Sequence, residues 1–302
     1  KKIIVTVGGS EAIDLTIRCL IQPGDEVLIV EPSFVCYRPI VSLCGGVPVV
    51  IETKEENEFR LTADELREKI TDKTKLLVLP YPNNPTGAIM RREDLEAVAK
   101  VLKDTNIMIA SDEIYSELTY SGKHCSIAEI EGMRERTIVI NGFSKSFAMT
   151  GWRLGFLGGP KEIVSQMLKL HQYAIMSSPT VSQYAAIVAM HSCQKDIDAM
   201  RNEYNIRRRF VVDSFNKLGL KCFAPQGAFY VFPCIKSTGM TSTDFCEKLV
   251  YTKKVAVVPG DAFGECGEGY VRVSYAYSLN HLREAIKRIG EFLEDIKNGN
   301  VQ

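Results

Sequence analysis

Short apolar segments alternate with helical segments almost without a break through residues 3–193, and this alternation limits the possible folds more than any other feature. Each apolar segment is rich in Val, Ile and Leu, as buried strands are, and the segment after it repeats its apolar residues at helical spacing. The pattern predicts an α/β fold in which a mostly parallel sheet is sandwiched by helices. We expect strands at 3–7, 26–30, 47–51, 75–79, 107–110, 137–140 and 154–158, and helices at 12–20, 38–44, from Thr62 onward, and at 92–103, 160–176 and 179–193.

The pattern changes after a long helix expected at 194–218. The segments that follow predict shorter strands at 221–223, 229–232, 255–258 and 270–274, with helices at 241–252 and 279–297. This mixture is typical of an α+β domain. A chain of 302 residues has the length of about two domains, so we expect a large domain at 1–195 and a smaller C-terminal domain at 196–302. Because the chain enters a strand at once and does not begin with Met, we also expect that an N-terminal segment precedes it.

The composition argues against several classes of protein. The 37 Lys and Arg residues balance the 37 Asp and Glu residues, and no basic tail indicates a nucleic-acid partner. No apolar run approaches the ~20 residues of a membrane-spanning helix. The nine cysteines include no C-x-x-C pair, which favours reduced thiols in a cytoplasmic protein over disulfides or a zinc site. We therefore expect a cytoplasmic protein without nucleic-acid, membrane or metal partners.

A lysine follows the buried strand at 137–140. Lys145 lies just past the carboxyl end of this strand, where ligands collect in open α/β sheets. Apolar neighbours lower the pKa of a lysine and make it a nucleophilic amine. We expect three side chains to surround it: Phe143, Phe147 and Trp152. Arg153 follows eight residues later as a possible phosphate clamp. On this segment alone, an ordinary surface lysine remains the alternative.

Other expected strand ends carry groups that suit a ligand. The Gly-Gly-Ser-Glu segment at 8–11 opens a helix, and unpaired N–H groups at a helix N-terminus bind anions, although two glycines also simply permit a tight turn. Asp112 ends a buried strand, where a carboxylate is costly without a partner, and Tyr115 reaches the same region. Further candidates are Phe34 and Tyr37 as an aromatic face, Asn84 in a loop fixed by prolines, and Arg272 on a strand of the second domain. For these four, packing, a turn or a structural ion pair remains the alternative.

Together these groups match the binding requirements of pyridoxal 5'-phosphate. This cofactor needs a lysine for its aldehyde, a carboxylate at its ring nitrogen and donors at its phenolic oxygen. It also needs an aromatic group on the ring face and an anion site with an arginine for its phosphate.

The chain resembles the fold-type I, class I and II pyridoxal-phosphate aminotransferases. The matching stretches occur in family order at 8–12, 23–27, 84–87, 111–115, 144–145, 151–153, 227–230 and 271–275. Segments 79–85 and 267–270 are most similar to the bacterial aspartate and aromatic aminotransferases, including the N-acetyl-diaminopimelate group. The resemblance implies an enzyme that moves an amino group from an amino acid to a 2-oxo acid, with 2-oxoglutarate as the expected acceptor, by a ping-pong Schiff-base mechanism. It also implies a homodimer.

The resemblance implies a role for each matching residue. Lys145 forms the Schiff base with the cofactor and moves a proton, and Asp112 pairs with the ring nitrogen. Tyr115 and Asn84 bind the phenolic oxygen, and Asn84 also borders the substrate. Arg272 binds the substrate α-carboxylate through a bidentate fork.

The remaining implied roles concern the ring face and the phosphate. Phe34 stacks on the ring. The phosphate is held through the helix N-terminus at Gly9, Ser10 and Glu11, together with Ser144 and Arg153.

Two departures from the family stand out. Many members have Ser three residues before the lysine, where this chain has Gly142. Members also carry, before the first strand, an arm with a tyrosine that reaches the partner subunit's phosphate.

Two other readings stay open. One is a carbon–sulfur lyase on the same fold, although the segment 150–153 is more similar to the transferases. The other is the effector domain of an aminotransferase-like transcription regulator, against which the match through 267–278 argues.

Overall fold

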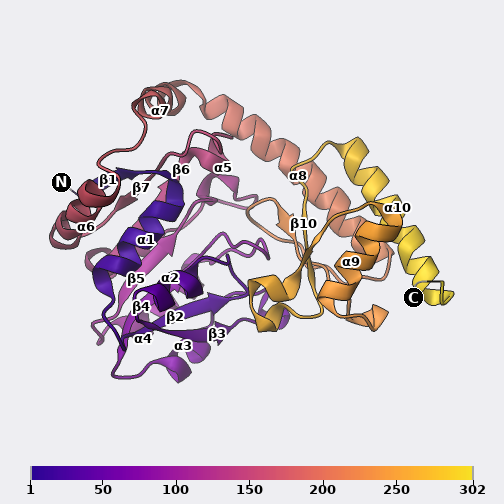
Figure 1. Cartoon of the computed structure of the whole chain (residues 1–302), viewed down its shortest axis with the longest axis horizontal. Helices are drawn as coiled ribbons and strands as arrows, with labels where there is room; N and C mark the ends of the chain where they lie inside the picture. The colour runs from indigo at the N-terminus through magenta and orange to yellow at the C-terminus, as the bar shows by residue number, and fades with distance from the viewer. Residues whose placement is uncertain (1, 301–302) are drawn as a thin grey trace.

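The computed structural model describes residues 2–300, which form two β-sheets connected by a long helix (Figure 1). The seven-stranded sheet and its helices come from the N-terminal part of the chain, drawn in indigo and magenta. Helix α8 (Gln194–Lys217) runs from there to the C-terminal part, drawn in orange and yellow, which contains the three-stranded sheet.

The large sheet has the strand order β1-β7-β6-β5-β4-β2-β3. Strands β2 to β6 pair in parallel, whereas β7 runs antiparallel to β6 and to β1. The predicted α/β fold with a mostly parallel sheet is therefore confirmed. The bounds are β1 Ile3–Thr6, β2 Glu26–Glu31, β3 Val47–Glu52, β4 Thr74–Leu79, β5 Met108–Asp112, β6 Thr137–Gly142 and β7 Gly155–Gly158.

Helices cover both faces of this sheet because its strands are apolar on both sides. In β2, Val27 and Ile29 pack into one core cluster, and Leu28 and Val30 into another on the opposite face. Thr62 caps α3 as expected, since its side chain accepts the Glu65 N–H while the Glu65 carboxylate accepts the Thr62 N–H. The helices are α1 Gly8–Leu20, α2 Tyr37–Leu43, α3 Ala63–Lys69, α4 Arg92–Leu102, α5 Phe143–Ser146, α6 Lys161–Ala174 and α7 Thr180–Ser192.

The small sheet is antiparallel, with β10 between β8 and β9. Its strands are β8 Tyr230–Val231, β9 Val258–Pro259 and β10 Val271–Ser274, and it packs with α8, α9 (Ser242–Lys253) and α10 (Leu279–Lys297) around a core of their own.

Two predicted strands of this region are wrong or too long. The segment 221–223 is not a strand, because the Cys222 N–H donates to the side chain of Asn216 instead of a neighbouring strand. The strand expected at 255–258 pairs only at Val258 and Pro259, and a proline cannot donate to a ladder.

Three aromatic rings join the two sheets. Phe59, in the loop after β3, packs edge-on against Phe232 and Tyr270, which stack on each other with centroids 5.0 Å apart. This contact belongs to the core of the large sheet. The division into domains at residues 195 and 196 stays a prediction.

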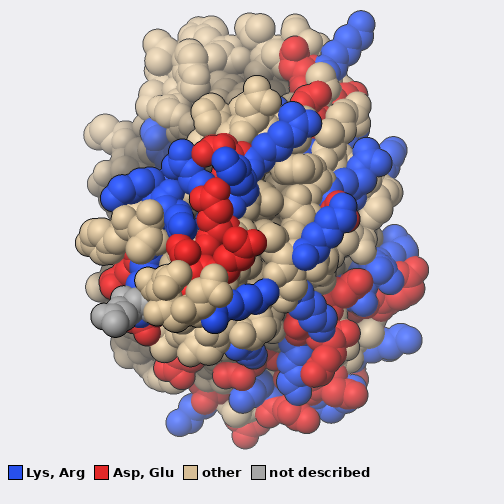
Figure 2. Space-filling view, turned by 90° about the vertical axis from the view of Figure 1, so that its right-hand side faces the viewer, with Lys and Arg blue, Asp and Glu red and all other residues tan. Residues whose placement is uncertain are grey.

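The face that carries the C-terminal helices shows Lys and Arg side chains interspersed with Asp and Glu (Figure 2). On α10, for example, Arg288 Nε lies 2.8 Å from Glu284 Oε1. Within residues 2–300, no helix combines the length and the apolar character needed to cross a membrane.

Candidate active site

A cavity of about 310 Å³ lies where the two sheets face each other. Ten of the eleven residues expected at the site line it: Gly9, Ser10, Phe34, Asn84, Asp112, Tyr115, Ser144, Lys145, Arg153 and Arg272. The other lining residues are Ile13, Tyr37, Pro80, Pro82, Ile114, Thr150 and Tyr230.

The topology of the large sheet explains this convergence. Asp112 ends β5, and Lys145 lies in α5, directly after β6. Parallel strands present their carboxyl ends at one edge of a sheet. Arg153 precedes β7, and because β7 is antiparallel, its beginning lies at the same edge. Arg272 reaches the cavity from β10 of the small sheet.

The lysine amine lies beside two aromatic rings, those of Tyr115 and Phe229, which pack edge-on against each other. Lys145 Nζ is 5.9 Å from the ring centroid of Tyr115 and 5.8 Å from that of Phe229. Burial lowers the pKa of Lys145, and the charges of Arg153 and Arg272 lower it further. Lys145 is therefore more readily deprotonated than an exposed lysine.

The expected apolar neighbours of this lysine are corrected. Phe143 and Phe147 pack against each other, with centroids 5.2 Å apart, and join a cluster with α7. Trp152 is 46% exposed. In a helical turn, the side chains two residues before and after a given position point away from it, so sequence proximity is misleading here.

Asp112 is a buried carboxylate with two donors. Tyr37 donates its hydroxyl to Oδ2 over 2.7 Å, and the Ile114 N–H donates to Oδ1 over 3.2 Å. Burial raises the pKa of Asp112, and these hydrogen bonds oppose the rise. Asp112 would therefore bind a cationic group placed beside it strongly. Tyr37, expected as part of an aromatic face, instead orients Asp112.

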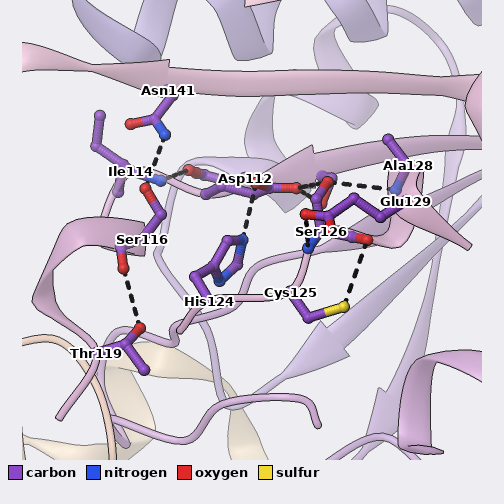
Figure 3. Close-up of polar contacts among 12 residues, drawn as sticks. Asp112, Ile114, Ser116, Thr119, His124, Cys125, Ser126, Ala128, Glu129 and Asn141 are labelled. Carbon is purple, nitrogen blue, oxygen red and sulfur yellow. Dashed lines mark hydrogen bonds and ion pairs between the residues drawn. The ribbon is translucent and has the colours of Figure 1, made fainter. Parts of the chain in front are cut away.

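The next residue, Glu113, is held by three side chains on the side away from Asp112. Its carboxylate accepts from Ser111 over 2.9 Å and lies 2.8 Å from His124 Nε2 and 2.5 Å from Ser126 Oγ. Figure 3 shows His124 and Ser126 reaching this turn from the loop that follows it. Successive side chains of a strand point to opposite faces, so fixing Glu113 also fixes the direction of Asp112.

The start of α1 and Arg153 form an anion site. Val7 precedes the helix and has no polar side chain to cap it, and Gly9 and Ser10 line the cavity. Arg153 has a left-handed backbone (φ 50°), and its guanidinium lies against Gly8, where Nη2 would be 2.7 Å from an added Cβ. Unpaired helix N–H groups and an arginine together suit a phosphate.

Glu11 does not line the cavity among the described residues, and its expected part in the phosphate site through the helix N-terminus stays a prediction. Its carboxylate accepts the Val7 N–H and pairs with His171 of α6, at 2.6 Å from Nδ1. The side chain therefore points behind the helix start and not toward a bound phosphate.

Arg272 is held in place by three groups. Its Nη1 donates to Asn84 Oδ1 over 2.9 Å, and its guanidinium lies between the rings of Tyr230 and Phe263, 4.7 and 4.8 Å from their centroids. The buried Nε has no hydrogen-bond partner within residues 2–300. A buried donor without a partner is costly, and the free donors of this arginine suit a carboxylate.

Gly142 stands where many members of the resembling family have a serine. An added Cβ at Gly142 would lie 3.0 Å from both Gly155 Cα and the Ile114 side chain, so a serine does not fit here without displacement.

Tyr230, which sequence reasoning did not single out as a site residue, lies with its hydroxyl 3.1 Å from that of Tyr115. It belongs to the stretch 227–230, the one signal that pointed to it.

The charges of the cavity suit an anionic cofactor and substrate. Among the described lining residues, Lys145, Arg153 and Arg272 are cations and Asp112 is the one carboxylate. The donor set matches pyridoxal phosphate, with an anion site at one end, a carboxylate for a ring nitrogen, and an amine for an aldehyde.

The family model for aminotransferase class I and II matches residues 1–289. The aspartate aminotransferase of Pyrococcus abyssi is 47% identical over 300 residues, which are 98% of this chain and 77% of that protein. A protein of Bacillus subtilis described as a probable N-acetyl-LL-diaminopimelate aminotransferase is 47% identical, over 97% of this chain and 74% of its own length.

Solved structures agree with these relatives. The crystal structure of the aromatic aminotransferase from Pyrococcus horikoshii OT3 superposes with a TM-score of 0.96 at 45% identity, over 98% of this chain and 80% of that chain. The family expected from the sequence motifs is confirmed, and these relatives give no support to the lyase or regulator readings.

Proposed function

The chain belongs to the class I and II aminotransferases, and from this membership we infer which groups of its cavity carry out each part of the reaction. The enzyme uses pyridoxal 5'-phosphate to move an amino group from an amino acid to a 2-oxo acid. The observation that carries the assignment of roles is the single cavity in which Lys145 lies with the buried Asp112 and two arginines.

Three groups would hold the cofactor. The N–H groups at the start of α1, with Ser144 and Arg153, would bind its phosphate. Asp112 would receive the ring nitrogen and keep a proton on it, because the buried carboxylate gains a cationic partner. Phe34, which lines the cavity, would lie against the ring, and Tyr115 and Asn84 would donate to its phenolic oxygen.

Lys145 would both attach the cofactor and move the proton of the substrate. When bound, the cofactor supplies an electron sink for the carbanion that forms at the substrate Cα. The lowered pKa of Lys145 makes its neutral amine available to take the Cα proton and to return it. Tyr115 and Phe229, which pack against each other, border the amine on one side and restrict its path there.

Arg272 would bind the α-carboxylate that every amino-acid substrate carries. The rings of Tyr230 and Phe263 and the side chain of Asn84 fix the guanidinium before the substrate arrives. This preorganisation reduces the entropy lost on binding. We propose aspartate or an aromatic amino acid as the donor, on the basis of the relatives' names. We propose 2-oxoglutarate as the acceptor, as the resemblance to the family implies.

A transamination assay tests this function. The purified chain is mixed with pyridoxal phosphate, 2-oxoglutarate and one donor at a time, and glutamate is measured. We expect glutamate and the 2-oxo acid of the donor in equal amounts. Release of ammonia and pyruvate from a sulfur amino acid, without glutamate, would instead indicate the lyase.

We also propose a homodimer, through the segment that contains the end of α6 and α7. Five large apolar side chains there are 63–86% exposed: Tyr173, Met176, Val181, Tyr184 and Val188. Val181, Tyr184 and Val188 recur at helical spacing on α7 and so share one face, and an exposed apolar face marks an interaction site. The Ser182 hydroxyl donates to the Trp152 carbonyl over 2.7 Å, so this surface adjoins the segment that carries Arg153.

Light scattering tests the dimer. Tyr184→Asp is expected to shift the protein toward monomer, whereas Tyr251→Asp on α9, which is 75% exposed, serves as the matched control. Dimers that survive Tyr184→Asp would exclude this surface.

A cytoplasmic location is proposed on the state of the cysteines. All nine lie in the described part of the chain and none is paired there. Unpaired cysteines are typical of reducing compartments. Cell fractionation would test this, and recovery from an oxidising compartment would contradict it.

A further inference from the structure

Behind the expected phosphate site, two side chains from different helices form a nearly buried pair. Glu11 lies in the first turn of α1, and His171 in the last turn of α6. Glu11 Oε1 is 2.6 Å from His171 Nδ1, and the two side chains are 11% and 6% exposed. The second carboxylate oxygen accepts the N–H of Val7, the residue before the helix. Neither side chain lines the cavity among the described residues.

We propose that Glu11 and His171 are positioning residues for the phosphate of the cofactor. Glu11 fixes the start of α1 from behind, and His171 offsets the negative charge that this fixation places beside a phosphate. The proposal rests on the proposed cofactor site.

The N–H groups at the start of α1 stay free to bind an anion because no side chain of the cap residue uses them. A Ser, Thr or Asp cap would accept the N–H of the second or third helical residue, which an anion needs. Here Val7 occupies the cap position, and the carboxylate of Glu11 takes the N–H of Val7 itself. Gly9 and Ser10 are therefore left to the cavity. The helix start is fixed without using the donors that the phosphate requires.

The charge of Glu11 also affects the phosphate site. Glu11 is one helical position past Ser10, so an unbalanced carboxylate there repels a phosphate bound at Gly9 and Ser10. A carboxylate only accepts hydrogen bonds, so the His171 Nδ1 carries the hydrogen and its positive end faces Glu11. On the cavity side, the guanidinium of Arg153 lies against Gly8. The helix start thus has the Arg153 guanidinium on its cavity side and, on the other side, the N–H dipole of His171, which faces the Glu11 carboxylate.

A double-mutant cycle separates this charge effect from a simple structural link. The variants are His171→Leu, Glu11→Gln and the combination of both. The affinity of each for pyridoxal phosphate and for pyridoxal, which lacks the phosphate, is measured by equilibrium titration with absorbance detection. Competition by inorganic phosphate against pyridoxal phosphate gives a second readout that does not depend on turnover.

We expect His171→Leu to lower the affinity for pyridoxal phosphate roughly tenfold, because the charge of Glu11 is then unbalanced. Pyridoxal affinity should change by less than about twofold. Glu11→Gln keeps the side-chain oxygen for the Val7 N–H and removes the charge, so it should bind pyridoxal phosphate at least as tightly as the wild type. The double variant should recover to within about threefold of Glu11→Gln.

The opposite pattern overturns the proposal. The pair is only a structural link between α1 and α6 if the double variant binds pyridoxal phosphate as weakly as His171→Leu does. The same conclusion follows if the affinities for pyridoxal and pyridoxal phosphate fall together. Should His171→Leu fail to fold, His171→Asn replaces it, because its amide places a donor near the position of Nδ1. Its loss of affinity should be smaller than tenfold and should also vanish with Glu11→Gln. Failure of the wild type to bind pyridoxal phosphate would refute the proposed function instead.

Discussion

Arg272 of the small sheet donates a hydrogen bond to Asn84 of the large-sheet loop, with 2.9 Å between Nη1 and Oδ1. The two residues are 188 positions apart in the chain, and each is expected to contact the substrate. A substrate that binds Arg272 at its carboxylate and reaches Lys145 at its Cα therefore bridges both sheets. Closure around such a substrate would exclude water from its reacting Cα.

Arg272→Lys should weaken all amino-acid substrates alike, by roughly tenfold to a hundredfold in kcat/KM. A lysine has one point of charge and cannot reproduce the two parallel hydrogen bonds of a guanidinium. The absorbance of the cofactor-loaded enzyme without substrate should stay unchanged. Steady-state kinetics with three unrelated donors and a spectrum of the resting enzyme measure both effects. A variant that loses thermal stability and keeps its KM values would show a structural arginine.

Asp112→Asn should reduce turnover by about 10²–10³-fold while the cofactor still binds, because the ring nitrogen loses its charged partner. The same change should not lower the melting temperature of the cofactor-free protein at neutral pH. Burial raises the pKa of Asp112 in the folded state, so the folded state binds more protons than the unfolded state between about pH 3.9 and the raised pKa. Stability falls as pH rises through this window, and an asparagine removes that loss. Near-normal turnover would exclude the assigned role.

Lys145 in the cofactor-free protein should react with an acylating reagent at lower pH than exposed lysines do, because its pKa is lowered by burial and by two arginines. Competitive labelling with mass spectrometry measures this, with the exposed Lys217 as an internal reference. Arg153→Met and Arg272→Met should each raise the pKa of Lys145. The unfolded chain binds more protons between the lowered pKa and about 10.4, so stability should rise with pH through that window. Labelling of Lys145 in step with Lys217 would contradict this account.

Gly8→Ala should both destabilise the protein and lower its affinity for the cofactor. Gly8 has φ +72°, a conformation that costs an alanine about 1–2 kcal/mol, and the new Cβ would lie 2.7 Å from Arg153 Nη2. Gly219→Ala is the matched control, because Gly219 has φ +83° with no described neighbour within 4 Å of an added Cβ. Both variants should lose similar stability in denaturant titrations, but only Gly8→Ala should lose affinity for pyridoxal phosphate. Equal affinity in the two variants would show that Arg153 does not depend on this contact.

The elements of the large sheet were predictable because each strand is apolar on both sides and each helix has its own periodicity. Thr62 with Glu65, for instance, is a local signal that depends on four residues. The short strands of the small sheet were less predictable. Whether Cys222 pairs with a strand depends on the side chain of Asn216, and no local pattern reveals that choice.

The site residues were predictable where a strand end positions them, as at Asp112 and Lys145. Their neighbours were not, because these come from distant segments. Phe229, rather than the adjacent Phe143, lies beside the lysine amine. Glu11 was expected at the phosphate site through the helix N-terminus, and the contact of its carboxylate with His171 from α6 could not be read from the sequence.

The most direct test of this account is to identify the lysine that carries the cofactor. The protein is loaded with pyridoxal phosphate, reduced with borohydride, digested and mapped by mass spectrometry, with Lys145→Ala as the control. We predict one modified peptide, with the pyridoxyl phosphate group on Lys145, and no modification and no transamination in the variant. Modification of a different lysine in the wild type, or an adduct and turnover that persist in Lys145→Ala, would contradict the assignment of this cavity as the active site.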